Sequence, residues 1–104
     1  MEKMALKVSD KDNVATIFAD DVTSGTVVTV QDKHGQREKI AVIGDIPYGH
    51  KIAIAPIQKG ELIFKYGEEI GIATADIQKG EYVHVHNLDS MRGRGDWEKE
   101  GGKP

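Results

Sequence analysis

The sequence predicts an all-β domain, and three observations indicate this fold class. Turn glycines followed by short runs of β-branched or aromatic residues recur along the chain, a pattern typical of a corner that leads into a strand. One such corner, IQKGE, occurs letter for letter at residues 57–61 and again at 77–81. No window shows an apolar stripe at helical spacing over more than about two turns.

The repeated corner predicts a compact fold. Looser copies, with an apolar residue three positions before a glycine, begin at Val22 and at Ile46. We expect the apolar residue of each copy to anchor its corner in the core. The four turn glycines lie at 25, 49, 60 and 80, and a solenoid would need regular spacing. The pattern therefore favours a barrel or folded ribbon.

The predicted strands follow this pattern in order. They lie at residues 6–8, 13–18, 26–30, 38–43, 50–54, 62–66, 70–74 and 82–86, with a hairpin loop at 32–36. A short helix competes with the second strand over residues 10–18, because Asp10 or Asp12 could cap it. We expect residues 1–89 to form the domain. Residues 90–104, rich in Gly, Arg, Lys and Glu, are expected to form a linker or flexible tail.

Length and composition exclude several classes of protein. A chain of 104 residues is enough for one domain. The absence of cysteine excludes disulfides, thiolate zinc sites and a cysteine nucleophile. The 14 basic and 17 acidic residues are mixed along the chain, whereas nucleic-acid binding normally leaves a basic stripe. No apolar run resembles a signal peptide or membrane span, so we expect a cytoplasmic protein that binds neither nucleic acid nor membrane.

The segment 84–87, HVHN, is the strongest local signal. On a strand through residue 86, His84 and His86 would share one face with Tyr82, while Val83 and Val85 would face the core. The two imidazoles could bind substrate or move protons. They could also ligate a metal if a third ligand came from elsewhere, or could be polar residues on a half-exposed strand. These three readings stay open.

Two further segments carry cations. His50 and Lys51 follow the turn glycine Gly49, and this grouping suits a carboxylate or phosphate, because backbone N–H groups can approach a ligand at such a corner. Lys65 would add positive charge. Tyr66 is expected to pack in the core, and His34, in the predicted hairpin loop, is expected to have no specific role.

The chain lacks the motifs of a self-sufficient enzyme. It has no Gly-x-Ser-x-Gly elbow, P-loop, dinucleotide fingerprint or His-Glu-x-x-His sequence. Its carboxylates are scattered over turns and loops, without the clustering that an acid pair or a hard-metal site needs. Any catalysis would therefore need apparatus outside this chain.

The chain carries an ordered set of segments at residues 12–15, 49–53, 65–68, 70–71, 73–77 and 80–87. This set resembles the N-terminal SAF-type domain of the altronate dehydratase family of sugar-acid lyases, and the resemblance covers residues 6–96. It implies a SAF domain with a β-clip, or folded-ribbon, architecture. It also implies a much larger catalytic domain or subunit associated with a divalent metal, commonly iron. No cofactor is expected on this chain alone.

The resemblance implies a small subunit or N-terminal domain of a sugar-acid dehydratase, inactive by itself, with an anionic sugar acid as substrate. In this interpretation His84 and His86 are catalytic, and either could also contact a metal. The remaining implied site residues are His50, Lys51, Lys65 and Asn87 for substrate binding, and Arg92, Arg94 and Asp96 at the junction with the large partner.

Two alternatives remain open. The chain could be the small subunit of a sulfolactate sulfo-lyase, or a non-catalytic SAF module that binds sugar acids or other anions. Since the chain stops at Pro104, a separate subunit and a piece of a longer protein are both compatible with the resemblance. Homo-oligomerisation is also left open.

Overall fold

The computed structural model describes residues 2–90 and confirms the all-β prediction, since these residues contain nine strands and no helix. The strands are β1 (Lys3–Leu6), β2 (Val14–Phe18), β3 (Val27–Gln31), β4 (Arg37–Ala41), β5 (Lys51–Ala53), β6 (Leu62–Lys65), β7 (Glu68–Ala73), β8 (Tyr82–Val83) and β9 (Leu88–Ser90). Over this range no helix is long and apolar enough to cross a membrane. Arg92, Arg94 and Asp96 lie outside the described residues.

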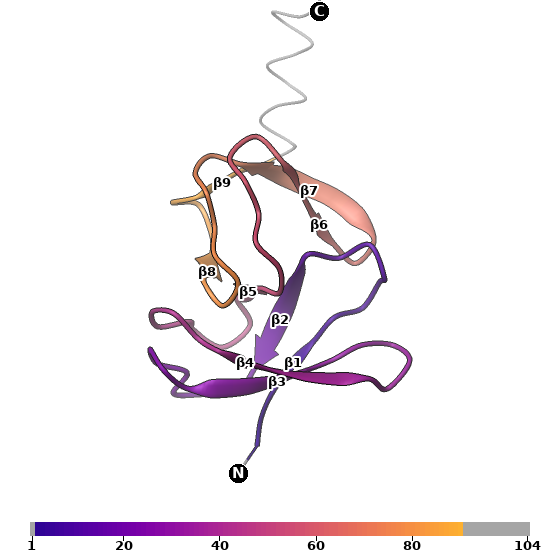
Figure 1. Cartoon of the computed structure of the whole chain (residues 1–104), viewed down its shortest axis with the longest axis vertical. Coiled ribbons are helices and arrows are strands. Elements are labelled where there is room, and N and C mark those ends of the chain that lie inside the picture. Colours follow the sequence, from indigo (N-terminus) through magenta and orange to yellow (C-terminus); the bar gives the residue numbers. More distant parts are fainter. Residues whose placement is uncertain (1, 91–104) are drawn as a thin grey trace, which may run out of the picture.

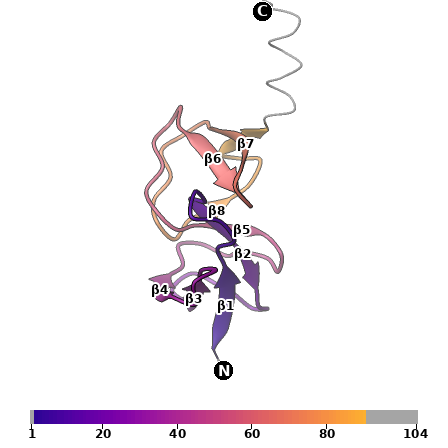
Figure 2. The same ribbon diagram turned by 90° about the vertical axis from the view of Figure 1, so that its right-hand side faces the viewer.

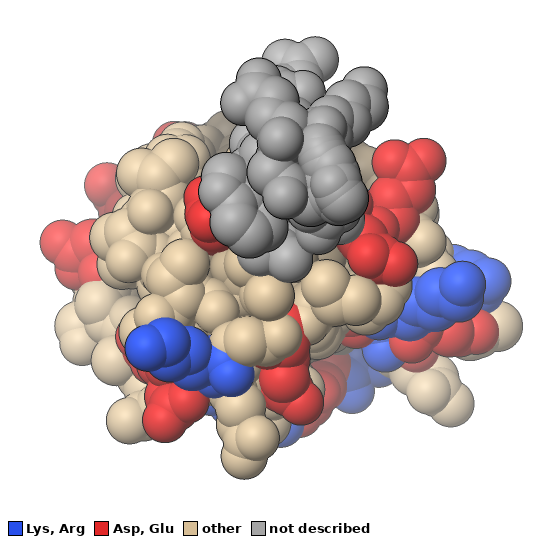
Figure 3. Space-filling view, turned by 90° about the horizontal axis from the view of Figure 1, so that it is seen from above, with Lys and Arg blue, Asp and Glu red and all other residues tan. Residues whose placement is uncertain are grey.

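Two sheets form the domain. One has the strand order β4-β3-β1-β2-β5-β8, and the other has the order β6-β7-β9. The β1–β3 pair is parallel, and the other named pairs are antiparallel. Figures 1 and 2 both place the smaller sheet at one end of the domain and β1, β3 and β4 at the other, with β5 and β8 between them. On the face seen in Figure 3, acidic and basic side chains are interspersed.

The core consists of two clusters joined through β2 and β5. Because side chains alternate along a strand, Ala15 and Ile52 enter one cluster while Val14 and Ala53 enter the other. The first cluster lies among β1 to β5 and the second beneath β6, β7 and β9. Two short central strands therefore hold both halves of the domain.

The predicted corners are confirmed, and they occur as two pairs. We name each corner by its glycine: Gly25, Gly49, Gly60 and Gly80, whose φ angles lie between 82° and 98°. The apolar residues that open the corners are all buried, at 2–3% exposure. Val22 bridges to Ile46, and Ile57 bridges to Ile77. The repeat in the sequence thus corresponds to two similar corner pairs, one beside each core cluster.

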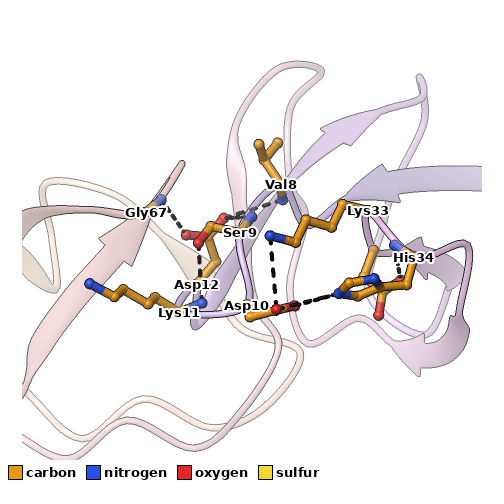
Figure 4. A network of polar contacts seen from close by, with 9 residues as sticks. Val8, Ser9, Asp10, Lys11, Asp12, Lys33, His34 and Gly67 are labelled. Atoms are coloured by element: carbon orange, nitrogen blue, oxygen red, sulfur yellow. Dashed lines mark hydrogen bonds and ion pairs between the residues drawn. The ribbon is translucent and has the colours of Figure 1, made fainter.

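The segment 8–13 forms a loop leading into β2, so the helical alternative over residues 10–18 is wrong. The Asp12 carboxylate accepts hydrogen bonds from the backbone N–H groups of Val8, Ser9 and Gly67 (Figure 4) and from that of Tyr66, all at 2.8–3.2 Å. Asp12 is buried and ties this loop to the turn between β6 and β7. Its acceptor capacity is used across the fold rather than at a helix N-terminus.

The prediction that Tyr66 packs in the core is wrong. Strand β6 ends at Lys65, and Tyr66 and Gly67 form a tight turn with φ angles of 57° and 79°. The alternation of the strand stops at this turn, and Tyr66 is 52% exposed.

The hairpin loop at 32–36 is confirmed between β3 and β4, and it places His34 beside Asp10. The two side chains lie 3.3 Å apart, and Lys33 lies 3.9 Å from the same carboxylate (Figure 4). The hydrogen bond from His34 is the main cause that lowers the pKa of Asp10; desolvation opposes it, and the positive charge of Lys33 lowers that pKa further. His34 therefore has a surface contact with Asp10, which no local pattern predicted.

The strand predicted over 82–86 is shorter than expected. Strand β8 ends at Val83, and residues 84–87 form a turn that leads into β9, a strand that was not predicted. Val85 is 78% exposed, so its predicted core position is wrong. The run is β-branched, yet it turns because the Asn87 side chain binds the His84 N–H and the Tyr82 carbonyl and so stabilises the turn.

Candidate functional site

Three of the predicted histidines gather at the end of β8. In the β5–β8 ladder, Ile52 lies opposite Tyr82 and Lys51 opposite Val83. One further step along this register places His50 opposite His84 on the face that carries Tyr82. The rings of His50 and His84 are 4.8 Å apart between centroids. We call His50, Tyr82, His84 and His86 the imidazole cluster.

Tyr82 is the centre of this cluster. Its phenol oxygen lies 2.8 Å from His50 Nδ1, and its ring stacks on His84 at 5.6 Å with only 8° between the planes. The centroid of the His86 ring lies 5.4 Å from the centroid of the Tyr82 ring. Tyr82 is also partly buried and packs against the first core cluster. Tyr82 thus connects the buried core to all three imidazoles, a role that the sequence reasoning missed.

The Gly49 corner differs from the other three in a way that leaves the His50 side chain available. At the other corners, the side chain after the glycine accepts a hydrogen bond from the backbone N–H two residues before that glycine, as Glu81 does from Gln78. The matching position in the Gly49 corner is Pro47, which has no N–H. His50 is therefore not needed as a cap and bonds to Tyr82 instead.

Asn87 shapes the turn that carries the other two imidazoles. Its side-chain oxygen accepts from the His84 N–H at 3.0 Å, and its side-chain nitrogen donates to the Tyr82 carbonyl at 3.0 Å. Asn87 is only 4% exposed. Both of its polar groups are used inside the fold, so Asn87 holds the turn in place, and the substrate contact expected from sequence stays a prediction.

The pKa of His84 is lowered by its surroundings in the cluster. Partial desolvation lowers the pKa of His84 first, and the nearby positive charges of His50, Lys51 and His86 lower it further. Like charges at short range disfavour the protonated imidazole. A neutral His84 can accept a proton, and a bound anion would reverse part of this effect.

The two predicted lysines lie on a different side of β5 from the imidazoles. Lys51 alternates with His50 and Ile52, and it faces the same way as its neighbour across the ladder, Thr16. Burial lowers the pKa of Lys51, and the positive charge of Lys65 lowers it further. The residues of the predicted anion pocket therefore lie in two groups, with the imidazole cluster on one side of β5 and the two lysines on the other.

The described residues do not form a metal site. Between residues 2 and 90, no group of three or more His, Cys, Asp or Glu side chains is arranged to hold a metal ion. The histidine-rich turn does not provide the three protein ligands typical of a zinc site. The metal contact considered for His84 and His86 therefore stays a prediction that needs a ligand from elsewhere.

Comparison with known proteins gives the family. Residues 3–91 match the model of the altronate/galactarate dehydratase SAF domain. The chain belongs to this family. It is 40% identical over 82 residues to the altronate dehydratase of Escherichia coli K12, a match covering 79% of this chain and 15% of that enzyme.

A second relative is a small chain. Identity to (2R)-sulfolactate sulfo-lyase subunit alpha of Chromohalobacter salexigens is 36% over 85 residues, covering 78% of this chain and 87% of that subunit. The galactarate dehydratase (L-threo-forming) of Escherichia coli K12 is 35% identical over 79 residues, which is 14% of its length. The SAF domain therefore occurs in relatives both as a small part of a large enzyme and as most of a subunit.

Proposed function

We propose that this chain is the small subunit or N-terminal domain of a sugar-acid dehydratase of the altronate dehydratase type. It contributes substrate binding, while a large partner carries the main catalytic site. The single observation that carries the proposal is the imidazole cluster, which gathers His50, His84 and His86 around one phenol on the surface of a family SAF domain.

The chemistry of dehydration fits such a surface. Removing the proton next to a carboxylate builds negative charge on that carboxylate, and donors placed at its oxygens stabilise the charge. In this proposal the N–H groups of His50 and His86 donate to the acid or to its hydroxyls. His84, whose pKa is lowered, accepts or relays a proton. Lys51 and Lys65 attract the anion.

The other site residues have supporting roles. Asn87 holds His84 and Tyr82 in place through the turn, and Tyr82 orients His50. Arg92, Arg94 and Asp96 stay assigned to the junction with the large partner by their resemblance to the family sequence. A divalent metal, in this proposal, belongs to the partner.

A second candidate keeps the lyase class and changes the leaving group. The observation that favours it is the match over 87% of the length of (2R)-sulfolactate sulfo-lyase subunit alpha. In that case sulfite would leave in place of water, and the same cations would bind a carboxylate and a sulfonate. The third candidate, a non-catalytic anion-binding SAF module, is the outcome expected if neither reaction is supported.

Reconstitution tests the proposal. Residues 3–91 of this chain replace the aligned segment of Escherichia coli altronate dehydratase, and the chain is separately combined with the remaining sulfolactate sulfo-lyase components of Chromohalobacter salexigens. We expect altronate dehydration by the chimera that exceeds the activity of the enzyme lacking this segment. Turnover of sulfolactate alone would favour the second candidate.

Variants link the activity to the imidazole cluster. H84N and H86N are expected to lower kcat/KM by at least about tenfold, as expected for loss of a proton-transfer or charge-stabilising group. V85A changes an exposed residue between them and serves as the matched control. Full activity of the large enzyme without this segment would contradict the proposal.

A further inference from the structure

The two lysines meet a pair of hydroxyl groups at one end of the second core cluster. Thr16 lies opposite Lys51 in the β2–β5 ladder. Its hydroxyl oxygen lies 3.4 Å from the phenol oxygen of Tyr66. The Lys65 ammonium lies 4.9 Å from the centre of the Tyr66 ring. The four side chains come from β2, β5, β6 and the turn after β6, so long-range folding brings them together.

These lysines have no carboxylate partner in the described part of the chain. The ion pairs there involve Lys33, His34, Arg37 and Lys79, and neither Lys51 nor Lys65 has a further polar contact. Glu68 lies opposite Lys65 in register, yet it forms no ion pair with Lys65. Lys51 is half-buried beside a second cation, and its pKa is lowered for that reason. Placing a second cation beside Lys51 disfavours its charged form, and an anion bound to both lysines would offset that repulsion.

Tyr66 occupies an unfavourable backbone conformation at this place. Its φ of 57° is left-handed, and the first position of such a two-residue hairpin turn prefers Asn, Asp or Gly. A bulky residue there costs about 1–2 kcal/mol. Asp12 holds the turn by accepting from the N–H groups of Tyr66 and Gly67. The fold thus tolerates strain that puts a phenol between Lys65 and Thr16.

We propose that Lys51, Lys65, Thr16 and Tyr66 form a second oxyanion-binding subsite on the other side of β5 from the imidazole cluster. The subsite takes a carboxylate, sulfonate or phosphate group. The two lysines supply charge, and the exposed Tyr66 phenol, whose oxygen can accept from the buried Thr16 hydroxyl, donates a hydrogen bond. The inference rests on the substrate-binding role proposed above, and it assigns the lysines to an anionic group other than the one at the imidazoles.

Sulfate binding to the full chain tests the subsite by NMR. Inorganic sulfate is titrated against sodium chloride at matched ionic strength, and the side-chain signals of Lys51, Lys65 and Tyr66 are followed. We expect saturable shifts with sulfate alone. K65Q should weaken sulfate binding by about tenfold, which corresponds to the loss of one charge-assisted contact.

Two variants separate binding from folding. Y66N keeps a residue that tolerates the left-handed turn, so the Tm should be equal or higher while sulfate binding falls severalfold. K33Q removes an exposed lysine of the β3–β4 loop and should leave sulfate binding unchanged. Equal shifts with chloride, or equal losses in K65Q and K33Q, would overturn the subsite.

Six-carbon sugar acids distinguish the source of the anion. A dicarboxylic acid that shifts both the lysine and the imidazole signals, and that loses its advantage over a monocarboxylic acid in K65Q, would show one ligand bridging both groups. Independent saturation of the two groups would show separate anions, and both results support the subsite. Sulfate binding without activity of the chimera refutes only the proposed function, while an active chimera without sulfate binding refutes only the subsite.

Discussion

Asn87 supports the imidazole cluster without belonging to it. Replacement by alanine leaves the His84 N–H and the Tyr82 carbonyl without their side-chain partner, so N87A should lower the free energy of unfolding by about 2 kcal/mol. Urea denaturation measures this change. V85A, in the same turn and 78% exposed, should change it by less than about 0.5 kcal/mol. Equal stability of the two variants would disprove the positioning role.

Protonation of His84 should be coupled to anion binding. Desolvation and neighbouring positive charge lower its pKa, so near pH 7 the free chain holds this imidazole mainly neutral. A bound anion favours the protonated form and raises that pKa. Binding should therefore take up a proton, and affinity should rise as the pH falls from about 8 to about 6. Calorimetry in buffers of different ionisation enthalpy measures the uptake, and a pH-independent affinity would contradict it.

The pKa of Lys51 reports directly on Lys65. Because the charge of Lys65 disfavours the protonated form of Lys51, K65M should raise the pKa of Lys51, while burial continues to hold it below the usual value. A 13C NMR titration of the lysine Cε signals measures this shift. K33M, which removes a lysine paired with Asp10, should not change it. An unchanged Lys51 in K65M would show that the two ammonium groups are not neighbours.

For single residues, the sequence indicated which side chains could carry chemistry better than it indicated where the fold places them. His50, His84 and His86 were recognisable as candidate residues, yet their meeting depends on the β5–β8 register, which no local pattern specifies. Pro47 carried a readable signal, because it occupies the position whose N–H is capped in the other corners. Tyr82 was placed on the face of His84 and His86, yet its role was missed because its contact with His50 also depends on the β5–β8 register.

Among the four corners, the Gly80 corner alone has no room for a side chain at its glycine. Gly80 has a φ of 98°, and an added Cβ would lie 2.5 Å from the Ala41 carbonyl oxygen. G80A should therefore destabilise the domain by about 2–4 kcal/mol, from backbone strain and steric overlap together. Gly44 has a φ of 81° with no atom within 4 Å of the added Cβ, so G44A should cost about 1 kcal/mol. Thermal unfolding compares the two, and equal losses would refute the steric argument.

Corners could be predicted from sequence and strand ends could not. The corner signal is local, since it needs one glycine with positive φ and one buried apolar residue in the same short segment. The end of β8 is decided by Asn87 and by the pairing of β9 with β7. Such partners are distant or ambiguous in sequence, and a β-branched run alone predicts a longer strand.

The whole domain should unfold as one unit although it has two core clusters. Strands β2 and β5 contribute side chains to both clusters, so neither cluster can open without disturbing the other. I63A, in the cluster beneath the small sheet, should destabilise the domain by about 2–5 kcal/mol. Unfolding followed by far-UV circular dichroism and by the NMR signal of Tyr82, which packs on the other cluster, should show the same transition midpoint. Separate transitions would show that the clusters are independent.

The sheet order is a property of the whole molecule that local patterns do not contain. The parallel β1–β3 pair, with β1 between β2 and β3, follows from long-range packing, and periodicity alone predicted only strands and turns. The resemblance to SAF domains supplied the folded-ribbon architecture. The family match over residues 3–91 agrees with that resemblance.

Proline at position 47 has a consequence for redesign. The side chain after each corner glycine either caps the backbone N–H two residues before that glycine or is available for other contacts. A proline two residues before the glycine removes that N–H and so frees the side chain. Replacing residues 78–81 by Pro-Tyr-Gly-His would remove the Gln78–Glu81 cap of that corner and place a second uncapped imidazole after its glycine. The reverse exchange, Gln-Lys-Gly-Glu over residues 47–50, would give this corner the same backbone cap as the others and remove one imidazole, that of His50, from the cluster.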